Sequence, residues 1–170
     1  NAGNKPYNIE NVSPDAHLAP SVGDSSSKTS SKAWHKIDGV CYNGSGKKVE
    51  GAITRGMDVS EWQGKINWKE AKKDLDFAFV RISYGTRHLD DYYAYNMTEA
   101  KAADVPVGTY VYSLAKTNKE ALAEAQLAIR QMQGHKVSYP VAFDLEDEAT
   151  LGTLTRKEIS QIALTFCDEI

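Results

Sequence analysis

Residues 105–112 read Val105-Pro106-Val107-Gly108-Thr109-Tyr110-Val111-Tyr112, a short run rich in β-branched and aromatic side chains. Such a run is typical of a strand, and Pro106 is tolerated because it stands at the start, where a missing N–H breaks no ladder. Thr117-Asn118-Lys119-Glu120 follows in the form of a capping box, which predicts a helix to about Gln133. Gly134 then ends that helix. A strand followed by a helix makes one βα unit.

The same pattern recurs on both sides of this unit. Further strands are predicted at residues 56–60, 77–83 and 139–146. The helices that follow them are expected at residues 68–73, 91–103 and 156–170. Asp91 is expected to cap the second of these helices, and Thr155 opens the third in a second capping box. Four successive βα units predict an α/β fold with a parallel sheet and right-handed crossovers.

Composition divides the chain of 170 residues into three parts. Residues 1–33 predict a disordered Ser-rich tail, because such a segment buries too little apolar surface to offset its loss of conformational entropy. Residues 34–54 are either a linker with incidental apolar residues or a short hairpin. The hairpin interpretation rests on a few apolar residues before Asn43-Gly44, namely Trp34, Ile37, Val40 and Tyr42. Residues 55–170 contain the βα units.

Four βα units do not close a barrel. A complete eight-unit barrel takes about 250 residues, and four units alone leave long edge strands unprotected. We therefore expect residues 55–170 to be the amino-terminal part of a (β/α) barrel of TIM-like type, with about its first four units. A smaller open α/β sheet is the alternative.

Bulk composition excludes several classes of partner. The net charge of −3 and the 25% of charged residues give no basic face for nucleic acid and no polybasic segment for anionic lipid. No apolar run approaches the roughly 18–20 residues that span a bilayer, and no signal peptide opens the chain. The two cysteines, Cys41 and Cys167, permit one disulfide. A buried free thiol at Cys167 is at least as compatible with the apolar pattern of its helix.

Polar and aromatic side chains gather where the predicted strands end. In parallel α/β folds ligand sites lie at the carboxyl ends of the strands, and the residues there are Asp58, Tyr110, Tyr112, Asp144 and Glu146. Asp144 and Glu146 stand two apart on one strand and therefore share a face. Two neighbouring carboxyl groups cannot both ionise without cost, so one pKa rises and a proton donor stands beside an anion. Glycoside hydrolysis needs this combination, and flat aromatic rings suit sugar rings.

Two other interpretations of these residues are open. Asp147 and Glu148 extend the pair into an acidic cluster that would also suit a solvated loop. Carboxylates together with His88 or His135 are a possible set of metal ligands, but neither histidine lies near a predicted strand end with ligand spacing. We therefore expect no metal and no other cofactor.

Two motifs, in the order and separation found here, resemble family 25 of the glycoside hydrolases, the lysozymes or muramidases. The amino-terminal motif is similar to the family's Asp-Val-Ser-x-x-Gln-Gly-x-Ile-Asp-Trp and reads Asp58-Val59-Ser60-Glu61-Trp62-Gln63-Gly64-Lys65-Ile66-Asn67-Trp68. The carboxyl-terminal motif resembles the family's Pro-Val-x-x-Asp-x-Glu strand and reads Pro140-Val141-Ala142-Phe143-Asp144-Leu145-Glu146. The resemblance runs from about Arg55 to the last residue.

The resemblance implies hydrolysis of the β-1,4 bond between N-acetylmuramic acid and N-acetylglucosamine in peptidoglycan. Glu146 matches the family's proposed general acid, and Asp144 and Asp58 match acidic residues of its cleft. Tyr110 matches an aromatic residue of the sugar site and shares its strand face with Tyr112. Tyr84 stands where the family often has an acidic residue, and we include it among the substrate-binding residues.

The same resemblance sets the expected context of the chain. It implies a secreted or wall-associated protein whose partners are peptidoglycan glycan strands. A carboxyl-terminal segment or a second chain is expected to complete the barrel. A non-catalytic domain that binds cell-wall glycan is the alternative function, and a hydrolase of another polysaccharide such as chitin is a weaker third.

Overall fold

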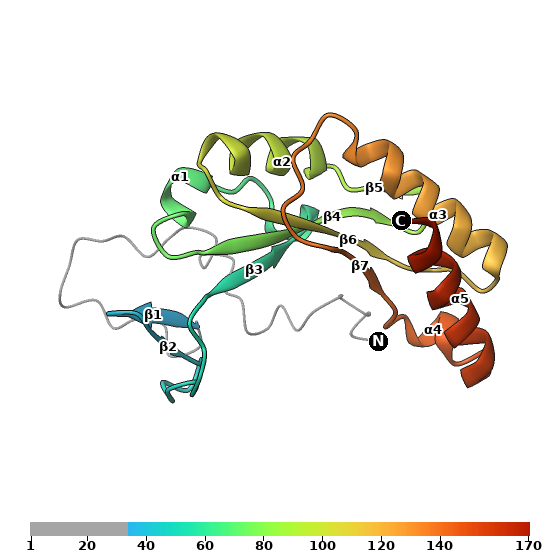
Figure 1. The fold of residues 1–170 in the computed structure, drawn as a ribbon, viewed down its shortest axis with the longest axis horizontal. Coiled ribbons are helices and arrows are strands. Elements are labelled where there is room, and N and C mark those ends of the chain that lie inside the picture. Colours follow the sequence, from blue (N-terminus) through green and yellow to red (C-terminus); the bar gives the residue numbers. More distant parts are fainter. Residues whose placement is uncertain (1–33) are drawn as a thin grey trace.

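A computed structural model describes residues 34–170, and a parallel sheet lies at its centre (Figure 1). The parallel strands follow the order β3 (Gly56–Val59), β4 (Phe77–Tyr84), β6 (Val107–Tyr112) and β7 (Val141–Asp144). A short strand, β5 (His88–Leu89), turns back and pairs antiparallel with the end of β4. The predicted parallel α/β sheet is thus confirmed. The predicted Ser-rich tail, residues 1–33, lies outside the described residues.

Helices alternate with the parallel strands along the chain. They are α1 (Trp68–Ala71), α2 (Tyr93–Ala102), α3 (Asn118–Met132), α4 (Glu148–Leu151) and α5 (Arg156–Glu169). Thr117 and Thr155 cap α3 and α5 as predicted, and the capping box of Thr155 with Glu158 is complete. A 3-10 turn, η3 (Glu61–Gln63), and the one-turn helix α4 were not predicted.

One face of the sheet packs against the helices and forms the core. Ala78, Val80 and Ile82 alternate along β4 with no exposed surface. Phe166 of α5 stacks on Phe143 of β7 with ring centroids 4.0 Å apart. This burial fixes which side chains of each strand face the helices, and the alternate residues therefore face the other side of the sheet.

That other side, called here the inner face, has an aromatic floor at the amino-terminal ends of the strands. The ring of Phe79 lies over Gly108, where a Cβ atom would come within 2.5 Å of the ring. The ring of Phe77 lies over Gly56 in the same way, and it also packs on Tyr139 with a centroid distance of 5.2 Å. Glycine is required at both positions because the rings touch the backbone there.

A hairpin precedes the sheet, so residues 34–54 are not merely a linker. Its strands are β1 (His35–Ile37) and β2 (Val40–Tyr42), and Asp38 and Gly39 between them have φ angles of 48° and 78°. Two positive φ angles are typical of a type I′ turn, so the turn between β1 and β2 falls at Asp38-Gly39. The predicted Asn43-Gly44 lies in a second turn after β2, where the N–H of Gly46 donates to the carbonyl of Asn43 at 2.9 Å. Lys36 binds Asp76 at 2.9 Å, which fastens the hairpin to the start of β4.

Two local predictions were wrong. Asp91 does not cap α2, whose N-cap position is Tyr92 without a side-chain bond; instead Asp90 Oδ1 accepts the N–H of Tyr92 at 3.0 Å. Cys167 is exposed, because α5 turns the preceding Phe166 inward, and the buried thiol is Cys41. Both thiols are free, so the open question of a disulfide is answered in the negative.

Candidate active site

The structure brings the predicted acidic residues together at the carboxyl edge of the sheet. Asp58 lies on β3, Asp144 is the last residue of β7, and Glu146 follows two residues later. β3 and β7 are the two ends of the strand order, with β4 and β6 between them. The negative charge of Asp58 nevertheless raises the pKa values of both Asp144 and Glu146. Asp58 of β3 and Ala142 of β7 also line the same hollow, so the sheet curves enough to bring its outer strands near one another.

Burial sets the protonation of this cluster. Burial is the largest cause of the raised pKa of each carboxyl group, and it raises the pKa of Asp144 to about 7 and that of Asp58 to about 6. The pKa of Glu146 is raised as well, by burial and then by Asp58. The three groups titrate as a coupled set, so near neutral pH the cluster holds both a proton and negative charge. This is the combination that acid catalysis beside an anion requires.

Several polar atoms of the cluster are buried without a partner among the described residues. They are Asp144 Oδ2, Glu146 Oε1 and the hydroxyl of Tyr112. Buried polar atoms in proteins nearly always form hydrogen bonds, so a set of orphaned ones at a single place indicates a site that receives a ligand. The ligand would offer hydroxyl or amide groups to the two carboxyl groups.

A bulge in β4 explains why Tyr84 joins the site. Arg81 pairs with Tyr110 of β6, but Ser83 pairs with Val111, so one extra residue is inserted between them. Tyr84 consequently lies opposite Tyr112, and the two rings stack with centroids 4.7 Å apart. Without the bulge the alternation of β4 would turn Tyr84 toward the helices.

The predicted tyrosines of β6 are more enclosed than sugar-stacking rings usually are. Tyr110 is 2% exposed and Tyr112 has no exposed surface. Tyr110 and Asp58 line one hollow of about 370 Å³ that also contacts Phe77 and Phe79 of the aromatic floor. The role of the three tyrosines in substrate binding stays a prediction.

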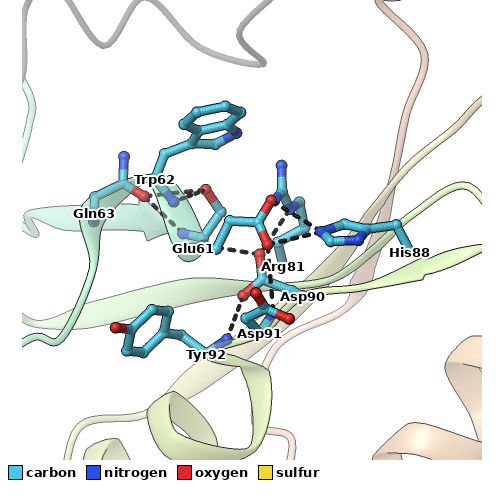
Figure 2. Close-up of polar contacts among 9 residues, drawn as sticks. Glu61, Trp62, Gln63, Arg81, His88, Asp90, Asp91 and Tyr92 are labelled. Carbon is cyan, nitrogen blue, oxygen red and sulfur yellow. Dashed lines mark hydrogen bonds and ion pairs between the residues drawn. The ribbon is translucent and has the colours of Figure 1, made fainter.

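Arg81 is the charged residue that sequence analysis missed. Its side chain is 1% exposed, and it pairs with Asp90 at 2.9 Å and with Glu61 at 2.9 Å (Figure 2). Its positive charge also acts on Asp144 and so opposes part of the rise in pKa there. The available signal was an arginine inside the apolar run Phe77–Ser83, where a charge needs buried partners.

The part of the chain that the structure describes has neither a metal centre of clustered side chains nor a membrane-spanning helix. Over residues 34–170, no group of three or more His, Cys, Asp and Glu side chains is placed to hold a metal ion. In the same part of the chain, none of the helices combines the length and the apolar character that a membrane span needs.

The raised pKa of Asp144 predicts a pH-dependent gain of stability in Asp144→Asn. Between pH 3.8, the ordinary pKa, and about 7, the folded protein keeps a proton that the unfolded chain releases. Stability from this group is therefore lost as pH rises through that window. The variant should match the parent near pH 4 and exceed its free energy of unfolding by about 1–2 kcal/mol at pH 8, after allowance for solvent screening. Urea unfolding at both pH values measures this, with the exposed Asp168→Asn as control.

The fold and the site together define a class of protein. Carboxyl groups of raised pKa at the carboxyl edge of a parallel sheet suit glycoside hydrolysis. In that reaction one carboxyl group protonates the glycosidic oxygen of the leaving sugar, and another stabilises the positive charge that develops on the remaining sugar ring. The chain is a member of that class. Residues 57–170 match the model of Glycosyl hydrolases family 25, and the chain belongs to this family.

Individual relatives cover different parts of the chain. Lysozyme M1 of Streptomyces globisporus is 38% identical over 60 residues, which make up 35% of this chain and 20% of that protein. The modular autolysin LytC of Streptococcus pneumoniae superposes with a TM-score of 0.66 at 25% identity, over 80% of this chain and 34% of that one. A family 25 glycosyl hydrolase of Bacillus anthracis has the same fold, with a TM-score of 0.62 at 20% identity over 86% of this chain and 60% of that one. The chain spans less than half the length of the curated relatives it matches.

Proposed function

We propose that this protein is a muramidase that hydrolyses the β-1,4 bond between N-acetylmuramic acid and N-acetylglucosamine in peptidoglycan. Membership of family 25 supports the reaction class. The similarity to lysozyme M1 supports the choice of substrate, and so does LytC, whose structure is also known with a synthetic peptidoglycan ligand. The single observation that carries the proposal is the pair of carboxyl groups at the carboxyl end of β7, Asp144 and Glu146, each with a buried oxygen that has no partner among the described residues.

In this proposal Glu146 donates the proton to the glycosidic oxygen. Its Oε1 atom is buried without a partner among the described residues, and burial and the charge of Asp58 raise its pKa, which favours the protonated form that can donate to a leaving oxygen. As the C–O bond breaks, positive charge develops on the sugar ring. The three carboxyl groups share their protons, so in the reactive form Glu146 holds a proton while Asp144 and Asp58 are ionised and stabilise that charge.

The tyrosines take supporting roles in the same proposal. The buried hydroxyl of Tyr112 has no partner among residues 34–170 and would donate to a sugar oxygen. Tyr84 covers that ring and offers its own half-buried face to the substrate. Tyr110 stands beside Asp58 in the hollow of the inner face and would contact the sugar next to the scissile bond.

We extend the proposal to the architecture and setting of the protein. The sheet would form the amino-terminal part of a (β/α) barrel of TIM-like type, because β3 and β7 curve toward one another. Strands from a carboxyl-terminal segment or from a second chain would pair with the edges and close the barrel. A substrate in the cell wall implies a secreted or wall-associated protein, with peptidoglycan glycan strands as its partners.

The identity of the new chain ends tests the proposed reaction. Purified peptidoglycan is incubated with the protein, reduced with borohydride, and analysed by mass spectrometry. A muramidase produces reduced muramic acid ends that grow with time. Reduced glucosamine ends would contradict the proposed bond, and glycan binding without any new reducing ends would establish a binding domain instead. Chito-oligosaccharides serve as the comparison substrate, and preferential cleavage of them would contradict the choice of peptidoglycan.

A further inference from the structure

Trp62 is an exposed aromatic side chain in the turn that follows the carboxyl end of β3, the edge of the sheet where the acidic residues lie. It lies in η3, the turn that leaves the carboxyl end of β3, four residues after Asp58. Its side chain is 56% exposed, although a tryptophan in water forgoes a large gain from burial. Ligands of parallel α/β folds bind at the carboxyl ends of the strands, and a flat exposed indole at that edge is available to a sugar ring.

The turn that carries Trp62 is held firmly by its own hydrogen bonds. The hydroxyl of Ser60 accepts the N–H of Trp62 at 3.3 Å, and Gln63 Oε1 accepts the N–H of Ser60 at 2.7 Å. Ser60 and Gln63 also form a complete capping box around this turn of only three residues. The backbone direction at Trp62 is therefore fixed locally.

A buried ionic network that includes Glu61 also fixes the position of this turn. The N–H of Glu61 donates to Asp90 Oδ2 at 2.8 Å, and the same oxygen accepts Arg81 Nε at 2.9 Å. The carboxylate of Glu61 binds Arg81 at 2.9 Å and His88 at 2.8 Å. In Figure 2 these groups lie on one side of the turn, and the indole of Trp62 points away from them.

The desolvation cost of this network indicates that the position of the turn has a functional role. Removing the charges of Arg81 and Asp90 from water costs several kcal/mol per ion before their attraction is counted. Their side chains are 1% and 0% exposed, so both bear that cost in full. In return the network orders a surface turn that has no buried side chain of its own. A rigid aromatic ring loses little entropy when a ligand binds it.

We propose that Trp62 forms a stacking subsite for one pyranose ring of a glycan strand, at the β3 side of the acidic site. The inference rests on the proposed function and adds a binding position to it. A pyranose ring has an apolar face of C–H groups, which gains by covering a flat indole. Arg81, Asp90 and Glu61 are positioning residues for this subsite, since they act on the turn and not on the sugar.

Another exposed tryptophan provides a matched control. Trp34 is 53% exposed, nearly the same as Trp62, and directly precedes β1 of the hairpin. The hairpin is fastened to Asp76, next to the amino-terminal end of β4, whereas η3 follows the carboxyl end of β3. The two tryptophans thus differ in location and hardly at all in exposure.

Binding in a Glu146→Gln background tests the subsite without turnover. The ligand is a peptide-free tetrasaccharide of alternating N-acetylglucosamine and N-acetylmuramic acid, and its Kd is measured by isothermal titration calorimetry. Adding Trp62→Ala should raise the Kd about tenfold, whereas Trp62→Tyr should stay within about twofold because a flat ring is kept. Trp34→Ala should leave the Kd unchanged.

The outcomes separate this inference from the proposed reaction. An unchanged Kd in Trp62→Ala overturns the subsite, even if the parent protein cleaves peptidoglycan. An equal loss in Trp34→Ala also overturns it, because exposure and not position would then govern binding. If the parent protein produces no reducing ends but Trp62→Ala still weakens binding tenfold, the subsite stands and the proposed hydrolysis fails. Thermal unfolding of each variant verifies that the fold is retained.

Discussion

Replacing Glu146 by Gln is expected to lower kcat on peptidoglycan by about 10²- to 10⁴-fold while leaving the fold intact. Glutamine keeps the size of the side chain but cannot donate the proton that the leaving oxygen requires. Since the amide still fills the same space, the KM should change little. The release of reduced muramic acid ends, measured at several substrate concentrations, gives both constants.

The matched control for this variant is Glu148→Gln. Glu148 lies two residues further on, at the start of α4, and its side chain is exposed. It should retain at least about half of the parent kcat, because an exposed charge of this kind interacts weakly with its surroundings. Equal activity of Glu146→Gln and the parent would remove Glu146 from the role of proton donor. Asp144, with its pKa of about 7, would then be the carboxyl group to test next.

Replacing Arg81 by Met is expected to lower the free energy of unfolding by about 3–5 kcal/mol. Methionine fills much of the space but leaves the carboxylate of Asp90 buried without its cation, and it releases Glu61 from an ion pair. Urea unfolding at pH 7, followed by circular dichroism, measures the change.

A double variant separates loss of the charge pair from loss of packing. Asp90→Asn removes the negative charge and keeps one side-chain oxygen, which can accept one of the two N–H groups, of Glu61 and Tyr92, that bind the two carboxylate oxygens of Asp90. Combined with Arg81→Met, it should recover part of the lost stability, and the coupling is read from a double-mutant cycle. Arg87→Met, at an exposed position six residues further on, is the control. A loss below about 1 kcal/mol in Arg81→Met would contradict the stabilising role of the network.

Local patterns in the sequence predict most of the sheet and the longer helices. The strand at residues 77–83 and the capping box at Thr155 are recognisable because each depends on neighbours within a few positions. The structure extends that strand by only one residue, to Tyr84, and it keeps the capping box complete. The predicted fourth strand is shorter, since regular pairing stops at Asp144 and Glu146 lies just beyond it.

Features that depend on distant partners were not predictable in the same way. Asp90 and Asp91 are equivalent as candidate caps in the sequence, and only the buried guanidinium of Arg81 draws Asp90 inward. The turn η3 requires that same anchor. The bulge after Arg81 leaves no mark in the residue pattern, although it decides that Tyr84 faces the acidic cluster.

The fastening of the hairpin to the start of the sheet has a practical consequence. Lys36 ties it to Asp76, next to the amino-terminal end of β4, where Arg55 also binds Asp74, and the acidic cluster lies at the opposite edge. Ile53, which is 79% exposed, is an accessible position there for the substitution Ile53→Cys, which provides a thiol for a chemical tether once the exposed Cys167 is replaced by Ser. A protein immobilised on a sensor chip through that residue would present its carbohydrate-facing edge to the flowing solution in a uniform orientation.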